Sequence, residues 1–221
     1  MFLKEIQALI LKDFRYEIRR RSAINGILLY VVSIVFVSYL SFQSVNNIDT
    51  QTWNALFWVI LMFACLHTVS GTFVQESPNR QYYYFTLASP QAIILSKIIF
   101  NGLLVFAISL LCYFVYVLFL GNKVENELMF ILCIMTGSIG ISSVLTMVSA
   151  ISSRTDNNFT MMAVLGFPLL LPLLLILMRL SEYAINGTDW LTAISYFLLL
   201  LLIDALVMIL ALILFPYLWR D

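Results

Sequence analysis

Six long apolar runs, separated by short polar segments, dominate the chain. They cover approximately residues 24–43, 53–74, 92–120, 128–151, 159–178 and 191–215. Each is near the roughly 20 residues that an α-helix needs to cross about 30 Å of hydrocarbon. The runs lack the alternation of apolar and polar residues that strands of a membrane β-barrel show. The pattern therefore predicts an all-α membrane protein with six transmembrane helices.

A different pattern precedes the first run. Within residues 2–21, apolar side chains recur at three- and four-residue spacing, and most basic side chains fall elsewhere on the helix surface. This predicts an N-terminal amphipathic helix, residues 1–22, that lies in the membrane interface before a single six-helix domain, residues 23–221. The alternative is a simple basic anchor for the first span. The candidate interfacial residues are Phe14, Arg15, Arg19, Arg20 and Arg21.

The composition agrees with a membrane protein. Hydrophobic residues make up 62% of the chain and charged residues 11%, and the mean hydropathy is +0.97. Soluble domains carry roughly 25% charged residues. The net charge of zero provides no general attraction to nucleic acid. Cys65, Cys112 and Cys133 lie within apolar runs and form no CxxC pair, so we expect buried thiols rather than a disulfide or metal site.

The distribution of Lys and Arg predicts the orientation. Lys123 and Arg179 lie on one side of the predicted membrane domain and the other ten basic residues lie on the opposite side, which accounts for all 12. Because basic residues concentrate in cytoplasmic segments, both termini should be cytoplasmic. Tryptophans near the predicted boundaries suggest an aromatic belt at the membrane surfaces, formed by Trp53, Trp58, Trp190 and Trp219.

Two ionisable side chains fall inside the apolar runs. Asp204 lies near the middle of the sixth run, where a carboxylate costs at least about 2.5 kcal/mol on insertion scales. It is either a pathway or coupling group, or a partner of Ser or Thr on a neighbouring helix. His67 lies in the second run. It is either a haem or metal ligand, or a hydrogen-bonded residue of the helix packing.

Motifs for catalysis are absent from the sequence. The chain contains no G-x-x-x-x-G-K-[ST] P-loop, and no HExxH, GxSxG or CxxCH motif. We therefore expect neither an enzyme nor a directly bound cofactor or metal.

The polar segment 75–91 lies between the second and third runs, on the predicted cytoplasmic side. It contains three consecutive tyrosines and a Ser-Pro pair that suits a helix start, with Ser89 as N-cap and Pro90 as the first helical residue. Aromatic side chains on this face suit docking to another protein. Contact with the lipid interface is the alternative.

This segment also carries a resemblance. Glu76, Leu87, Ser89, Pro90 and Lys97 have the spacing of the coupling loop of type-2 ABC-exporter permeases. The stretches QESPNRQYYYFTLASPQ and LFPYLWRD, with further matches along most of the chain, are similar to the cytochrome c maturation permease B (CcmB) family. The six spans and the N-terminal interfacial helix also match that superfamily.

The resemblance implies a permease subunit, in the bacterial inner membrane, of an ABC complex for haem export or trafficking in cytochrome c maturation. A separate ATPase subunit would use ATP, and the complex would drive release of a haem-loaded periplasmic chaperone. The implied partners are this ATPase, a haem-handling membrane protein, a small one-span subunit and a second copy of the chain. Haem would be the substrate carried or handled. The alternatives are a permease for a drug, lipid or polysaccharide, and a scaffold that transmits force without transporting.

The residues expected to couple the permease to the ATPase follow from this resemblance. Glu76 and Arg80 would supply charged contacts, and the three tyrosines would be the buried anchors. The full set is Glu76, Arg80, Tyr82, Tyr83, Tyr84, Ser89, Pro90 and Lys97.

Overall fold

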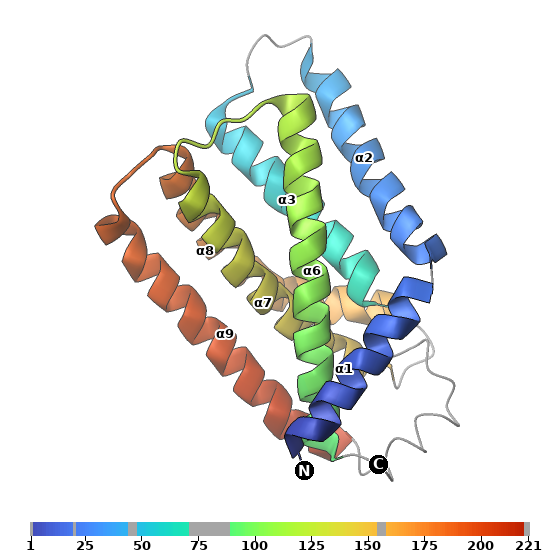
Figure 1. Cartoon of the computed structure of the whole chain (residues 1–221). Coiled ribbons are helices and arrows are strands. Elements are labelled where there is room, and N and C mark those ends of the chain that lie inside the picture. The colour runs from blue at the N-terminus through green and yellow to red at the C-terminus, as the bar shows by residue number, and fades with distance from the viewer. Residues whose placement is uncertain (1, 20, 44–47, 71–88, 154–157, 219–221) are drawn as a thin grey trace.

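A computed structural model describes residues 2–19, 21–43, 48–70, 89–153 and 158–218 of the chain. Within these residues the fold is all-helical and contains no strand (Figure 1). The helices are α1 (Phe2–Arg19), α2 (Arg21–Gln43), α3 (Thr50–Val69), α6 (Pro90–Leu120), α7 (Glu127–Ser152), α8 (Asn158–Ile185) and α9 (Trp190–Leu218).

Six of these helices, α2 to α9, are long and apolar enough to cross a membrane, which confirms the six predicted spans. The ends agree within a few residues, except at α3 and α8. The second run was predicted to continue to residue 74; α3 ends at Val69, and residues 71–74 lie outside the described residues. The fifth was predicted to end at residue 178, whereas α8 continues to Ile185. Pro168 and Pro172 lie inside α8, which remains helical through both of them.

Helix α7 is the centre of the bundle. It packs against α3, α6, α8 and α9, and its side chains are buried along almost its entire length. Two glycines let neighbouring helices approach closely. A Cβ atom on Gly137 would lie 2.8 Å from Leu177 of α8 and 3.3 Å from Trp58 of α3. The small residues of α7 therefore determine how closely the bundle closes around it.

Small polar residues of α7 face α6. Thr146 accepts a hydrogen bond from Asn101 Nδ2 (2.8 Å), and the hydroxyl groups of Ser138 and Ser109 lie 3.3 Å apart. Between these two contacts, Ser142 Oγ lies 3.4 Å from the Cβ position of Gly102. The i, i+4 stripe of Ser138, Ser142 and Thr146 is thus the surface on which α6 packs.

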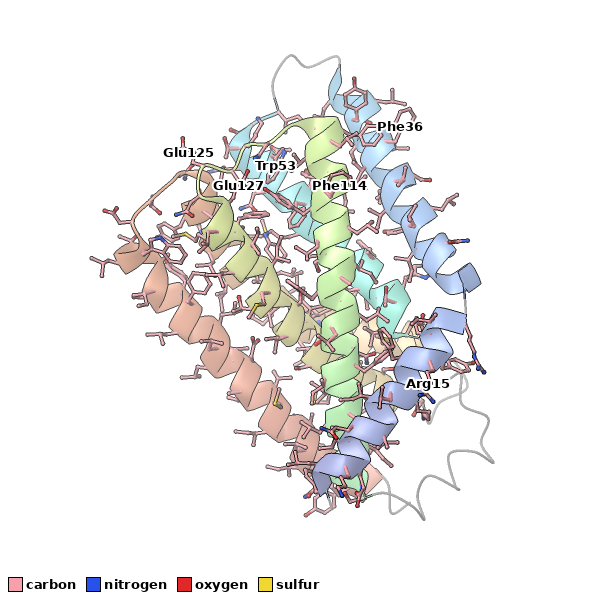
Figure 2. The ribbon with its side chains drawn as sticks, in the orientation of Figure 1. Arg15, Phe36, Trp53, Phe114, Glu125 and Glu127 are labelled. Atoms are coloured by element: carbon pink, nitrogen blue, oxygen red, sulfur yellow. The ribbon has the colours of Figure 1, made fainter. Side chains whose placement is uncertain are left out.

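The two ends of the bundle differ in charge. Helix α1 and the first turns of α6 lie at one end, which we call the α1 end (Figure 1). The described charged side chains there are the basic residues Lys4, Lys12, Arg15, Arg19 and Lys97 and the acidic residues Glu5, Asp13 and Glu17. The opposite end, formed by the α6–α7 and α8–α9 connections, carries the acidic residues Asp49, Glu125, Glu127, Glu182 and Asp189 and the basic residues Lys123 and Arg179. Arg15, Glu125 and Glu127 mark the two ends in Figure 2.

Candidate functional site

The candidate coupling region lies at the α1 end, where α6 begins. Ser89 is the N-cap of α6, and its side chain accepts a hydrogen bond from the backbone N–H of Ala92 (3.4 Å). Pro90 is the first helical residue. This is the helix start that the Ser-Pro pair predicts. The other residues of the predicted coupling loop, Glu76, Arg80, Tyr82, Tyr83 and Tyr84, lie outside the described residues.

Lys97, two turns into α6, forms an ion pair with a residue that the sequence did not single out. Its Nζ lies 3.4 Å from Asp13 Oδ2 on α1, and the two side chains are only 6% and 8% exposed. Asp13 also lies 3.3 Å from the Nζ of Lys12. Removing one partner of a buried ion pair costs up to about 3–5 kcal/mol when the other charge is left without compensation, and here Lys12 would still compensate part of the Asp13 charge. The pair therefore fixes α1 to the beginning of α6.

A signal for Asp13 exists in the sequence. It lies three and four residues after Ile10 and Leu9, on the same face of α1 as Ile6, which is also buried. A buried carboxylate beside apolar side chains requires a partner. The predicted interfacial residues Phe14, Arg15 and Arg19 are exposed, and Arg20 lies outside the described residues. Arg21 is the first residue of α2.

At the opposite end, hydrogen bonds connect α3 to α8. The indole N–H of Trp58 donates to Ser181 Oγ (2.8 Å), which donates to Asn54 Oδ1 (2.7 Å). The amide of Asn54 donates to the carbonyl oxygen of Met178 (2.8 Å). This network explains why α8 extends past residue 178. Ser181 of α8 is buried against α3 and does not lie in a polar loop.

The aromatic-belt interpretation of two tryptophans is wrong. Trp53 and Trp58 are fully buried, whereas Trp190 is 43% exposed. Trp53 packs edge-on to Tyr116 of α6, with ring centroids 4.9 Å apart, and its carbonyl oxygen accepts the Tyr116 hydroxyl (2.8 Å). Because α3 is enclosed by its neighbours at this level, its tryptophans stabilise the helix packing instead of facing lipid headgroups.

The two predicted intramembrane polar residues have different surroundings. His67 is exposed near the end of α3, and its ring centroid lies 5.8 Å from that of Tyr30 on α2. Asp204 is 4% exposed at the middle of α9, and its carboxyl group lies against Gly140 of α7. The structure does not bring His67 and Asp204 together with each other or with the described part of the coupling region. Among the described residues, no group of three His, Cys, Asp or Glu side chains has the arrangement of a metal site.

The fold and the charge distribution define the class of protein. The chain is a multi-pass helical membrane protein with an additional helix fixed across the start of its third span. It matches the CcmB protein family over residues 4–217 and belongs to that family. Membership makes it a transporter permease subunit, of ABC type, for haem export in cytochrome c maturation. No curated protein and no solved structure matched the chain.

Proposed function

We propose that the chain transmits ATP-driven movement from a separate ATPase subunit into the membrane during haem export or trafficking in cytochrome c maturation. The family match over residues 4–217 carries this proposal, because it places the chain in an ABC transporter complex. The sequence contains no P-loop of its own, so ATP would be hydrolysed by the partner. Release of a haem-loaded periplasmic chaperone would be the output.

The described residues support a specific route for this movement. The predicted coupling loop, residues 75–91, leads directly into α6 at the Ser89 cap. Lys97 then joins α6 to Asp13 of α1 by a buried ion pair. A push on the loop would move α1 and the start of α6 as one unit. Helix α6 would pass the movement to α7 through the Asn101–Thr146 and Ser109–Ser138 contacts.

The assembly would contain two copies of the chain over two ATPase subunits, by analogy with other ABC exporters. A haem-handling membrane protein and a small one-span subunit would complete it. Both termini and the α1 end would face the cytoplasm of the bacterium. Helix α1 would lie in the membrane interface, with its exposed apolar side chains Leu11, Phe14 and Ile18 toward lipid.

Replacing Tyr82, Tyr83 and Tyr84 together with Ala tests the docking site. Buried aromatic anchors contribute most of the affinity in many interfaces, so the triple variant should insert in the membrane but lose the co-purifying ATPase. Pull-down of tagged permease from solubilised membranes measures this. Phe114→Ala provides a matched control, because Phe114 is 68% exposed on α6, away from the α1 end (Figure 2). Normal ATPase recovery with the triple variant would refute the assignment.

A further inference from the structure

Asp204 has no partner that would stabilise a negative charge. It lies at the middle of α9 in the membrane-spanning region, and only 4% of its surface is exposed. Neither of its carboxyl oxygens has a hydrogen-bond partner. An ionised carboxylate at such a position is costly, because neither water nor a donor replaces its hydration.

The space that Asp204 occupies is created by a glycine. A Cβ atom on Gly140 of α7 would lie 2.2 Å from Asp204 Oδ1 and 2.7 Å from the Cδ1 atom of Leu173 on α8. Any side chain at residue 140 would therefore displace the carboxyl group. Helices α7 and α9 pack this closely because one contributes a glycine and the other an aspartate of matching size.

The charged groups on the helices around Asp204 lie toward the helix ends. On α8, Arg179 is six residues beyond Leu173, or about 9 Å along the axis at 1.5 Å per residue. Arg179 pairs with Glu182 (3.2 Å). On α6, Lys97 pairs with Asp13. On α7, Glu127 accepts a hydrogen bond from Asn122 at the opposite end. The remaining titratable groups on the packed helices are Cys112, Tyr113, Tyr116, Cys133, Tyr183, Tyr196 and Tyr217.

We propose that Asp204 is a proton-binding site whose occupancy depends on the contact between α7 and α9. While α9 rests against Gly140, the carboxyl group is neutral and holds its proton. When the two helices separate and water enters, the O–H bond breaks, the proton passes to water and the carboxylate becomes hydrated. The return of α9 requires the proton to bind again.

The proton-binding site goes beyond the proposed function. It rests on that function only for the assumption that ATP hydrolysis by the partner moves α7 and α9. The neutral resting carboxyl group does not depend on ATP. The two parts can therefore fail separately, and they need separate measurements.

The resting protonation state is measured by infrared spectroscopy of the permease–ATPase complex in phospholipid vesicles at pH 7. A neutral carboxyl group has a C=O stretching band apart from that of carboxylates. We expect such a band in the wild type, its loss in Asp204→Asn and a shifted band in Asp204→Glu. Assembly of each variant is checked by ATPase co-purification. Identical spectra of wild type and Asp204→Asn would overturn the proposal.

Linkage to helix movement is measured by transferring the vesicles to D₂O. Exchange of the Asp204 proton for deuterium shifts the C=O band. We expect this shift to be slow at rest and several-fold faster during ATP hydrolysis, because water then reaches the carboxyl group. Equal rates in a complex that hydrolyses ATP would overturn the link to movement. A complex that hydrolyses no ATP would contradict the proposed function instead, and would leave the resting band in place.

Gly140→Ala separates α7 from α9 without ATP. The added methyl group must displace the carboxyl group, so exchange of the Asp204 proton in D₂O should be faster at rest than in the wild type. Gly26→Ala is the matched control, because no atom lies within 4 Å of its Cβ position on α2. Unchanged exchange in a folded Gly140→Ala complex would show that the contact does not control the proton.

Discussion

Individual polar residues specify how the helices of this bundle pair. Apolar surface alone drives little helix association in lipid, because lipid tails are as apolar as leucine side chains. The contacts of α6 with α7, α3 with α8 and α1 with α6 each contain a specific polar pair. Asn101 meets Thr146 between α6 and α7, and Trp58 meets Ser181 between α3 and α8. Asp13 meets Lys97 between α1 and α6.

The Asp13–Lys97 pair gives a prediction at this scale. Lys97→Ala leaves buried Asp13 with only the partly exposed Lys12 among its described partners, and should destabilise the docking of α1 by less than the roughly 3–5 kcal/mol of a fully uncompensated buried charge. We expect a lower melting temperature of the purified permease and faster proteolysis within α1. Exchanging the charges, with Asp13→Lys and Lys97→Asp together, should restore part of the loss.

Lys4→Ala is the control for this experiment. Lys4 is an exposed basic residue on the same helix, and an exposed charge contributes about 0–1 kcal/mol. If Lys97→Ala melted at the same temperature as Lys4→Ala, the ion pair would not fix α1 to α6.

At the scale of helices, the apolar runs were sufficient to predict the number of membrane-spanning helices and their order along the chain. The runs predicted six spans because crossing a membrane requires a continuous apolar length, which a sequence shows directly. They did not predict the end of α8, because Arg179 and Glu182 resemble a loop and only the contact of Ser181 with α3 extends the helix. They also misplaced Trp53 and Trp58, since length and hydropathy do not indicate which helices are enclosed by others.

The candidate site was less predictable than the fold, for a related reason. Ser89 and Pro90 were predictable because helix capping is local. The Asp13–Lys97 pair was not predicted, because it joins residues far apart in the chain. The sequence located Asp204 in a span, but its contact with Gly140 depends on how α7 and α9 pack. Local chemistry is visible in a sequence, whereas partners across helices require the three-dimensional arrangement.

The α3–α8 network gives a prediction at the element scale. Ser181→Ala removes the acceptor of the Trp58 indole and the donor to Asn54, both buried. An unsatisfied buried polar group costs about 1–3 kcal/mol, so the variant should melt measurably below the wild type. Thermal unfolding of the permease in lipid nanodiscs, followed by tryptophan fluorescence, measures this.

Ser41→Ala is the matched control for that measurement. Ser41 is exposed on α2 and donates only to the carbonyl oxygen of Val37 in its own helix (2.9 Å). Its replacement should leave the melting temperature nearly unchanged. Equal effects of the two substitutions would mean that the network between α3 and α8 does not stabilise the bundle.

For the whole molecule, the charge difference between the two ends predicts the orientation in the membrane. Basic residues outnumber acidic ones at the α1 end, where Lys4, Lys12, Arg15, Arg19 and Lys97 lie with Glu5, Asp13 and Glu17. At the opposite end, Asp49, Glu125, Glu127, Glu182 and Asp189 outnumber Lys123 and Arg179. Because basic segments stay in the cytoplasm, the α1 end should meet the ATPase and the acidic end should face the periplasm. The long-range packing around α7 would then connect the two compartments through a continuous core.

Single cysteines at the two ends test this orientation. In intact bacterial spheroplasts, a membrane-impermeant maleimide should label Glu125→Cys and leave Arg15→Cys unlabelled. After permeabilisation it should label both, because both side chains are exposed (Figure 2). Cys65, Cys112 and Cys133 are fully buried, so the wild type should react little in either condition and serves as the background control. Labelling of Arg15→Cys before permeabilisation would place α1 outside the cytoplasm. It would also remove the route from an ATPase through Asp13 and Lys97 to α6, since ATP is hydrolysed in the cytoplasm.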